Sequence, residues 1–350
     1  ERVLSPRALN RALLARQLLL QPAALDPARA LERTCGLQTQ YAPAAYVALF
    51  SRLAGFTRAD LTGALNRRRV VQGWVMRSTI HMVSARDYGT FTAAVRAVRR
   101  AQWLRADKQA ASSEMEAVME AAATTVRAFL ADGPRKQAEI QRHLADAGFP
   151  AAAWRGAQLW LDLVRVPPAG TWELPRAHVY GLAAQWVPGP EPEEGEARVR
   201  LVERYLRGFG PASAKDVASF CGFTVGQARA ALAGLGLRRF RDESGGELLD
   251  LPRAPLPEPG TPAPVRFLEQ WDAVLLVHAR RARVLPEEHR PKVFATSMPQ
   301  SVPTFLVDGQ VAGTWRFEAG RVVVSPFAGL PGPARREVDA EAERLAAFAS

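Results

Sequence analysis

The sequence has few of the residues and none of the spacings that mark metal-dependent, cofactor-dependent or disulfide-bonded proteins. Its two cysteines, Cys35 and Cys221, lie far apart and outside any Cys-x-x-Cys pair, so we expect no disulfide and a reducing compartment, the cytoplasm. The five histidines are scattered, without zinc or iron–sulfur spacing. No P-loop occurs, and Gly234 and Gly236 are followed by arginines rather than by the third glycine of a dinucleotide fingerprint. We expect no metal and no cofactor.

Neither a membrane span nor a secretion signal is evident. No apolar run approaches the ~20 residues that cross a bilayer, and the arginine-rich start lacks the apolar core of a signal peptide. Hydrophobic residues make up 48% of the chain and charged residues 23%, as in soluble globular proteins. The 350 residues suggest about two to four modules. Because no coiled-coil dimerisation helix is evident, we expect a monomer with no membrane partner.

Excess positive charge is confined to the first third of the chain. Residues 1–110 hold 18 Lys and Arg against 6 Asp and Glu, and the net charge of the whole chain is +11. A surface that faces a polyanion such as double-stranded DNA would show this distribution; a general compositional preference for arginine is the alternative. Arg67, Arg68 and Arg69 are expected phosphate contacts, because guanidinium groups bind phosphate with two hydrogen bonds. A solvated helix end would also favour them.

The pattern of helices and strands predicts an α+β fold. Helical periodicity followed by a strand hairpin occurs three times, which is typical of the winged-helix variant of the helix-turn-helix. Linkers rich in proline and glycine lie at 188–195 and 252–264. The expected order is three tandem winged-helix modules and a β-rich C-terminal domain that closes with a helix: 1–90, 91–187, 196–252 and 265–350.

Several individual elements follow from local signals. Leucines recur at helical spacing over 6–20. A strand is expected at 172–174 after a proline-rich turn, and another over the apolar run 274–278. After Gly73 the period changes to two, which predicts strands over 74–82. The apolar residues expected on one face of those strands are Trp74, Met76, Ile80 and Met82.

A short polar segment, Gly36–Tyr41, lies between two apolar helix patterns. Gly36 is a helix stop, and Pro43 biases the preceding residue towards extended backbone. In extended chain Gln38 and Gln40 would point the same way, roughly 7 Å apart. Two neutral amides can orient a water molecule and contact a sugar, yet neither can take up a proton at neutral pH. On its own, the pair would also fit a solvated polar turn.

Five segments carry a more specific signal. They are Leu4–Asn10, Gly36–Gln40, Trp74–Met82, Phe267–Asp272 and Pro303–Trp315. Through these segments, the sequence resembles the winged-helix DNA glycosylases of AlkZ/YcaQ type over most of its length. The Gln-x-Gln form of the second segment is similar to the AlkZ branch, whereas YcaQ-like members are expected to carry Gln-x-Asp.

The resemblance implies a monofunctional DNA glycosylase with Gln38 and Gln40 as its catalytic residues. A purine alkylated at N7 or N3 is already cationic, so its glycosidic bond breaks towards an oxocarbenium-like sugar with little protonation. The two glutamines would place the attacking water and offer carbonyl dipoles to the developing charge. The expected partner is double-stranded DNA containing alkylated purines, chiefly N7-alkylguanine, bulky adducts or interstrand crosslinks. Lys108 is the only lysine in residues 1–110 and lies far in sequence from the pair, so we expect no Schiff-base lyase step.

Two further residues are expected to contact DNA. Arg77 lies in a segment that carries the resemblance, and Gln310 lies at the tip of a hairpin with a tight turn at Asp308. Such a tip also fits a surface turn without function. His81 and Asp272 are expected to be structural.

Other functions stay open at this point. A winged-helix scaffold more often serves a transcription regulator than an enzyme, and a fold does not decide function. A non-catalytic DNA-binding regulator or damage sensor is therefore the alternative. A protein-interaction scaffold is a third class, against which the basic first third argues. The resemblance also implies a role in general alkylation repair or in bacterial self-resistance to a DNA-alkylating antibiotic.

Overall fold

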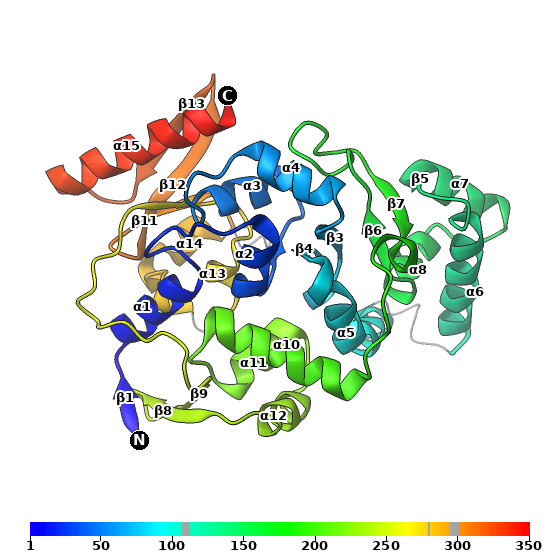
Figure 1. Cartoon of the computed structure of the whole chain (residues 1–350), viewed down its shortest axis with the longest axis horizontal. Helices are drawn as coiled ribbons and strands as arrows, with labels where there is room; N and C mark the ends of the chain where they lie inside the picture. The colour runs from blue at the N-terminus through cyan, green and yellow to red at the C-terminus, as the bar shows by residue number, and fades with distance from the viewer. Residues whose placement is uncertain (107–112, 279–280, 295–300) are drawn as a thin grey trace.

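The computed structural model of the chain describes residues 1–106, 113–278, 281–294 and 301–350. Along the longest axis, the C-terminal strands and helix lie at one end and helices α6 (Ser113–Phe129) and α7 (Gln137–Asp146) at the other (Figure 1). Helix α10 (Glu194–Phe209) lies between them, beside α11 (Ala214–Cys221) and α5 (Ala85–Ala106) (Figure 1). In the described part of the chain, no helix is long and apolar enough to cross a membrane.

The chain begins with β1 (Arg2–Leu4) and α1 (Pro6–Arg16). Ser5 caps α1 by accepting a hydrogen bond from the Ala8 backbone N–H at 3.2 Å, and proline stands at the first helical position. We expected this helix to continue to residue 20. It ends earlier, at Arg16, because Leu18 adopts left-handed backbone with φ of 59°.

The elements that follow deliver the glutamine pair. They are α2 (Pro27–Thr34), β2 (Leu37–Gln38), α3 (Ala42–Phe50), α4 (Arg58–Asn66), β3 (Val70–Trp74), η1 (Met76–Ser78) and β4 (Ile80–Ser84). Helix α2 ends where Cys35 and Gly36 both adopt left-handed backbone. A Cβ on Gly36 would lie 2.8 Å from Cγ1 of Val83, so glycine is what allows β2 to approach β4.

The period-two pattern after Gly73 is confirmed with one correction. Trp74 is paired with Ile80 across β3 and β4, and Met82, two residues further on, shares their face. Met76 does not share that face. It lies in η1 between the strands and packs in a different buried cluster from Met82, because the chain turns there instead of continuing as a strand.

One six-stranded sheet joins the first two expected modules, with strand order β2-β4-β3-β6-β7-β5. Its second half consists of β5 (Arg135–Lys136), β6 (Leu163–Arg165) and β7 (Val179–Leu182). The two halves meet where Gly73 pairs with Val164. A Cβ on Gly73 would lie 2.8 Å from the Leu163 carbonyl oxygen and the Tyr88 ring, so this contact also needs glycine. The helices around this half are α5 (Ala85–Ala106), α6 (Ser113–Phe129), α7 (Gln137–Asp146), α8 (Ala153–Trp160) and α9 (Ala183–Trp186).

The strand expected at 172–174 is absent from this described segment. The Gly170 backbone N–H donates to the Leu174 carbonyl at 3.0 Å, so the segment closes on itself as a turn. Strand pairing resumes only at Val179, because the local bond leaves 172–174 without a neighbouring strand.

The third expected module consists of helices and a hairpin. They are α10 (Glu194–Phe209), α11 (Ala214–Cys221), α12 (Val225–Ala233), β8 (Arg238–Asp242) and β9 (Glu247–Asp250). Ser213 and Thr224 cap α11 and α12 with complete capping boxes. Strand β1 pairs in parallel with β8, so the N-terminus is part of this hairpin's sheet.

The C-terminal segment forms a four-stranded antiparallel sheet and a final helix. Its elements are β10 (Arg266–Leu268), β11 (Thr304–Val307), β12 (Gln310–Glu318), β13 (Arg321–Pro326) and α15 (Gly332–Ala349). The expected tight turn between β11 and β12 is confirmed. The strand expected at 274–278 is wrong: α13 (Ala273–Leu276) begins there, because the Asp272 carboxylate accepts a hydrogen bond from the Val274 backbone N–H at 3.1 Å and starts a helical turn.

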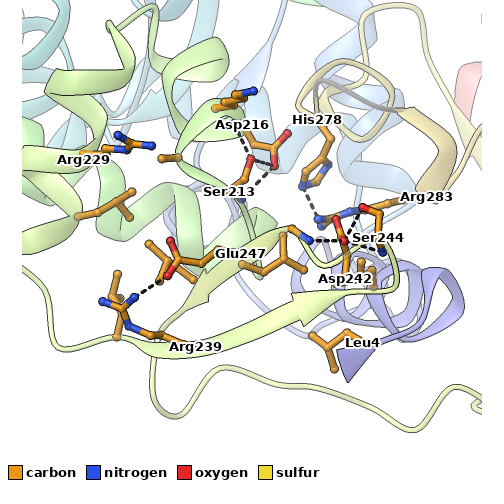
Figure 2. A pocket seen from close by; sticks show the side chains of 18 of the residues that line it. Leu4, Ser213, Asp216, Arg229, Arg239, Asp242, Ser244, Glu247, His278 and Arg283 are labelled. Atoms are coloured by element: carbon orange, nitrogen blue, oxygen red, sulfur yellow. Dashed lines mark hydrogen bonds and ion pairs between the residues drawn. The ribbon is translucent and has the colours of Figure 1, made fainter. Parts of the chain in front are cut away.

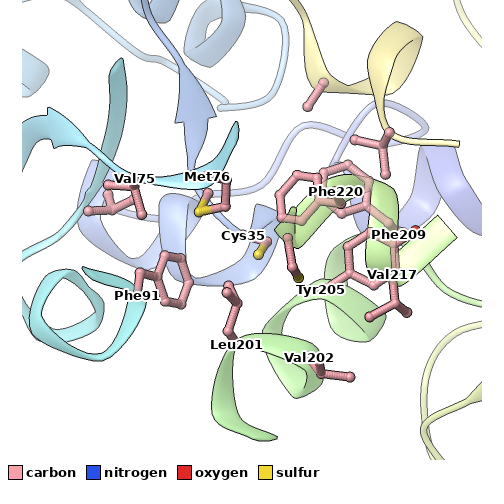
Figure 3. Close-up of a cluster of buried hydrophobic side chains, with 14 of the residues drawn as sticks. Cys35, Val75, Met76, Phe91, Leu201, Val202, Tyr205, Phe209, Val217 and Phe220 are labelled. Carbon is pink, nitrogen blue, oxygen red and sulfur yellow. The ribbon is translucent and has the colours of Figure 1, made fainter. Parts of the chain in front are cut away.

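A buried cluster connects the glutamine strand to the third expected module. Figure 3 shows Cys35 and Met76 from the first part of the chain packed near Tyr205 of α10 and Phe220 of α11. The aromatic rings of Tyr205 and Phe220 lie 5.1 Å apart between centroids. Both cysteines are free thiols and buried. Helices α10 and α11 therefore pack against the part of the chain that contains β2 and the β3–β4 connection, and they support it.

Candidate active site

Gln38 lies on the edge strand of the six-stranded sheet, and Gln40 lies just beyond it. Gln38 pairs across β2 and β4 with His81 and its side chain is nearly buried, at 7% exposure. The chain then leaves the strand, so Gln40 is exposed. The side-chain oxygen of Gln40, Oε1, accepts a hydrogen bond from the Ile80 backbone N–H at 3.3 Å. Both amides therefore lie against the same short stretch of β4.

Arg77 holds the Gln38 amide in one orientation. Its Nη2 donates to Gln38 Oε1 at 2.7 Å, and its Nη1 donates to the Phe220 carbonyl at 3.3 Å. The guanidinium also lies 5.0 Å from the centroid of the Phe220 ring, a cation–π contact. Only the amide oxygen can accept from an arginine, so the Gln38 NH₂ group points away from Arg77. The oxygen keeps a second lone pair that can accept from a water molecule.

The backbone around Arg77 is strained so that this side chain points inwards. Arg77 and Ser78 both adopt left-handed backbone, with φ of 53° and 54°. Each non-glycine residue in this conformation costs on the order of 1 kcal/mol. Burial lowers the pKa of Arg77 to about 10, which still leaves the group charged at neutral pH. This inward position argues against the predicted direct contact between Arg77 and a DNA phosphate, because the guanidinium is already bound on both sides.

His81 is neutral and cannot supply a proton near neutral pH. It is buried beside Arg77, and burial, followed by the charge of that arginine, lowers its pKa to about 3. Its Nδ1 lies 3.1 Å from the Thr79 carbonyl oxygen. The geometry supports the expected structural role. The residue opposite Gln38 offers a neutral ring and no acid.

The three consecutive arginines lie exposed after α4, on the surface of the first part of the chain. Arg68 stacks over the Trp186 ring at 4.1 Å, and Arg69 lies 3.7 Å from the Asp26 carboxylate. These contacts are at the surface, so they would leave guanidinium edges accessible to phosphate. The role of Arg67, Arg68 and Arg69 in binding DNA stays a prediction.

The hairpin tip at Gln310 does not protrude. The Gln310 side chain donates to the Arg283 carbonyl at 3.0 Å, and the Gly309 carbonyl accepts from Asn10 Nδ2 at 2.8 Å. Asp308 forms ion pairs with Arg7 and Arg11 of α1. The tip is thus attached to α1. This arrangement argues against the predicted DNA contact by Gln310, because its amide is used to hold the hairpin in place.

Asp272 is structural, as expected. It is buried, and both its oxygens accept hydrogen bonds from Arg52 at 2.9 Å. This two-bonded pair attaches α3 to the C-terminal sheet. Lys108, which entered the expectation of no lyase step, lies outside the described residues. Within the described residues, no group of His, Cys, Asp or Glu could hold a metal ion.

A cavity of about 1020 Å³ lies elsewhere, between β1, the third expected module and the residues after α13. Neither glutamine lines it. Figure 2 shows Arg239 paired with Glu247, and Arg283 beside His278.

Comparisons with known proteins identify the class. A family model described as DNA glycosylase AlkZ-like matches residues 31–348, so the chain is a DNA glycosylase. It belongs to the AlkZ-like DNA glycosylase family, which confirms the resemblance seen in its motifs. The interstrand DNA cross-link repair glycosylase of Streptomyces sahachiroi is 24% identical over 93% of this chain and 91% of that protein. The solved structure of Streptomyces sahachiroi DNA glycosylase AlkZ superposes with a TM-score of 0.79 at 19% identity, covering 99% and 97% of the two chains, which shows a shared fold.

The sequence does not predict the inward position of Arg77. The sequence predicts a DNA contact for Arg77 because this residue lies in a segment that carries the resemblance, whereas the structure shows its guanidinium bound to Gln38. The strand period places only His81 on the face opposite Trp74 and Ile80, because Arg77 lies in η1, where the strand is interrupted. That face is covered by α5 and by the helices of the third expected module.

Replacement of Arg77 by methionine tests whether it positions Gln38. Methionine fills much of the same space without holding the amide, so we expect the rate constant for base release to fall about tenfold, while the KM for DNA stays nearly unchanged. A phosphate contact would behave differently, with a higher KM and a smaller salt dependence. Single-turnover and steady-state kinetics separate the two, with circular dichroism to check the fold.

Acidification tests the buried neutral His81. Its folded-state pKa of about 3 lies below the ordinary value of 6.5, so below pH 6.5 the unfolded chain takes up a proton that the folded chain refuses. The free energy of unfolding should therefore fall as the pH drops. The contribution of His81 to this fall is about 2 kcal/mol between pH 6.5 and 5. Urea unfolding at pH 7 and 5 should show a smaller fall for His81→Asn than for wild type. His278 is the same in both proteins, so it cannot account for a difference between them. An equal fall in the free energy of unfolding for wild type and for His81→Asn would contradict a neutral His81.

Proposed function

We propose that this glycosylase hydrolyses the N-glycosidic bond of purines that already carry a positive charge, such as N7-alkylguanine, including bulky adducts and interstrand crosslinks. The observation that carries the proposal is the Gln38 amide fixed by Arg77 beside a histidine that cannot be protonated near neutral pH. In the described hydrogen bonds of Gln38 and Gln40, no carboxylate takes part. The arrangement can orient and polarise, but it does not offer acid catalysis.

The reaction is balanced without a proton donor when the base is cationic. The bond from C1′ to the purine nitrogen breaks, its electron pair neutralises the purine, and the positive charge passes to the sugar as an oxocarbenium ion. Water then bonds to C1′ and releases its proton to solvent. Gln38 is proposed to hold this water through its free lone pair and NH₂ group, and Gln40 to contact the sugar or water from the exposed side.

The permanent charge of Arg77 favours cationic lesions over neutral ones as substrates. A cationic lesion brings its charge into the site and keeps the same net charge when the bond breaks, so Arg77 opposes the bound lesion and the transition state to similar extents. A neutral purine or uracil would have to leave as an anion while a cation forms on the sugar, which the site does not assist with a proton. We therefore propose little action on neutral damage.

The rest of the chain is proposed to bind duplex DNA as a monomer. The proposed winged-helix modules span 1–90, 91–187 and 196–252, and the β-rich segment 265–350 is proposed to support the first of them. The basic surface around Arg67, Arg68 and Arg69 would bind phosphates. Two free, buried thiols support a reducing compartment, the cytoplasm. Protection against an alkylating antibiotic is one proposed role, and general repair is the other.

Replacement of each glutamine by alanine tests the mechanism. Loss of one preorganised polar group costs about 10²–10³ in rate at comparable sites, so Gln38→Ala and Gln40→Ala should each lower release of N7-methylguanine from duplex DNA severely. Gln21→Ala, a change of an exposed glutamine outside the site, is the matched control.

Wild type should release no uracil, and its apurinic product should remain uncut and untrapped by borohydride. Full activity of both glutamine variants would remove the mechanism. Sequence-selective binding to undamaged duplex, without any base release, would instead support the alternative function of a non-catalytic DNA-binding regulator.

Salt titration tests the arginine surface. Each phosphate contact contributes about 0.9 to the slope of log binding constant against log salt, so Arg67→Ala should reduce that slope by roughly one contact. Arg316→Ala, which removes an exposed arginine of the C-terminal sheet paired with Glu318, is the control and should leave the slope unchanged. Equal slopes for all three proteins would exclude Arg67 from the interface.

A further inference from the structure

Thr39, the residue between the two glutamines, is held by three hydrogen bonds. Its backbone N–H donates to the Ile80 carbonyl at 2.8 Å. Its hydroxyl accepts from Gln72 Nε2 at 3.4 Å and donates to the Tyr41 carbonyl at 3.3 Å. Thr39 and Gln72 are both buried. Threonine and valine differ in the hydroxyl and hardly in shape, so these two side-chain bonds are what threonine adds at this position.

The bond from Thr39 to Tyr41 spans Gln40. Threonine hydroxyls that bond to the backbone two residues away favour turns, and the chain bends at Gln40 and Tyr41. The Gln40 side chain comes back towards β4, where its Oε1 accepts from the Ile80 N–H. Ile80 therefore accepts from Thr39 at its carbonyl and donates to Gln40 from its N–H. The bend and the amide are both fixed against this one residue.

Gln72 is itself fixed by the second half of the six-stranded sheet. The antiparallel pairing of β3 with β6 places Gln72 opposite Arg165. Gly170 lies over the Gln72 amide so closely that a Cβ there would be 2.3 Å from Gln72 Oε1. Arg165 donates to the Ala177 carbonyl at 2.9 Å, so the segment that contains Gly170 is attached at both ends. The amide of Gln72 is therefore held in place from the side away from Thr39.

This network lies on the face of the sheet opposite Gln38. Gln38 shares its face with His81, its partner in β4, whereas Thr39 is the next residue along the chain and points to the other side. Because the Thr39 hydroxyl is buried, it can act on the reaction only through the position of Gln40. Arg77 holds Gln38, so the two glutamines have separate supports.

We propose that Thr39 and Gln72 are positioning residues of the glycosylase, which hold Gln40 in the orientation that contacts the sugar or the water. This inference rests on the proposed function of Gln40. The alternative is that the two side chains only satisfy each other as buried polar groups. In that case their loss would lower the stability of the fold and leave the rate of base release unchanged.

Replacement of Thr39 by valine removes the hydroxyl and keeps the shape. We expect the single-turnover rate constant for N7-methylguanine release to fall about tenfold, while the Kd for duplex DNA changes less than about twofold, because the variant displaces a catalytic group and no binding group. Thr39→Ser keeps the hydroxyl and should retain most of the rate. Gln72→Met should cause a smaller fall. Thr92→Val, which removes another buried hydroxyl bonded to a backbone carbonyl, in α5, is the matched control.

A double variant shows whether Thr39 acts through Gln40. Adding Thr39→Val to Gln40→Ala should cause no further fall in the rate constant, because the amide that Thr39 positions is already gone. A structural role would lower the rate in this background as well. That result, or an unchanged rate in Thr39→Val alone, would overturn the inference.

The Ile80 backbone N–H gives a readout that needs no activity. It donates to Gln40 in wild type, so its exchange with solvent deuterium, followed by NMR, should become faster in Thr39→Val, as in Gln40→Ala, and stay unchanged in Thr92→Val. If wild type releases no alkylated base, the proposed function fails, and this measurement still tests how Gln40 is held. Unchanged exchange in Thr39→Val would overturn the inference in either case.

Discussion

The hydrogen bond from Arg77 to Gln38 is the interaction on which the site depends. It places a charged guanidinium in a partly buried position, which is costly unless each face of the group is occupied. The Gln38 oxygen, the Phe220 carbonyl and the Phe220 ring provide those contacts. Since Phe220 belongs to α11, the orientation of a glutamine near the N-terminus is fixed only when a helix some 180 residues later in the sequence has docked. The site is therefore a product of the whole fold.

Burial is the main reason why the groups around Arg77 do not titrate near neutral pH. Arg77 adds to the effect of burial in keeping His81 neutral, and burial also raises the pKa of Cys35 and of Cys221, so neither thiol ionises. Arg77 itself stays protonated. A site whose groups keep their protonation states from mildly acidic to mildly alkaline pH can act by position and polarity alone. This property fits a reaction in which the substrate provides the charge.

Local signals predicted the local parts of this arrangement. The turn after β11 and the extended backbone at Gln38 follow from neighbouring residues. The pairing of Gly73 with Val164, which joins two expected modules in one sheet, does not follow from local signals, because nothing near either residue specifies its partner. The inward turn of Arg77 depends on α11 in the same way. The run 274–278 was ambiguous by itself, since a short apolar segment fits a strand or a helix, and one cap at Asp272 decided it.

If the leaving group supplies its own activation, selectivity among cationic lesions must come from binding. Two neutral amides would treat a methyl group and a large adduct on the same nitrogen alike, because neither amide reaches beyond the sugar and the water. Contacts remote from the bond can still accelerate the reaction when they hold the reacting atoms in place.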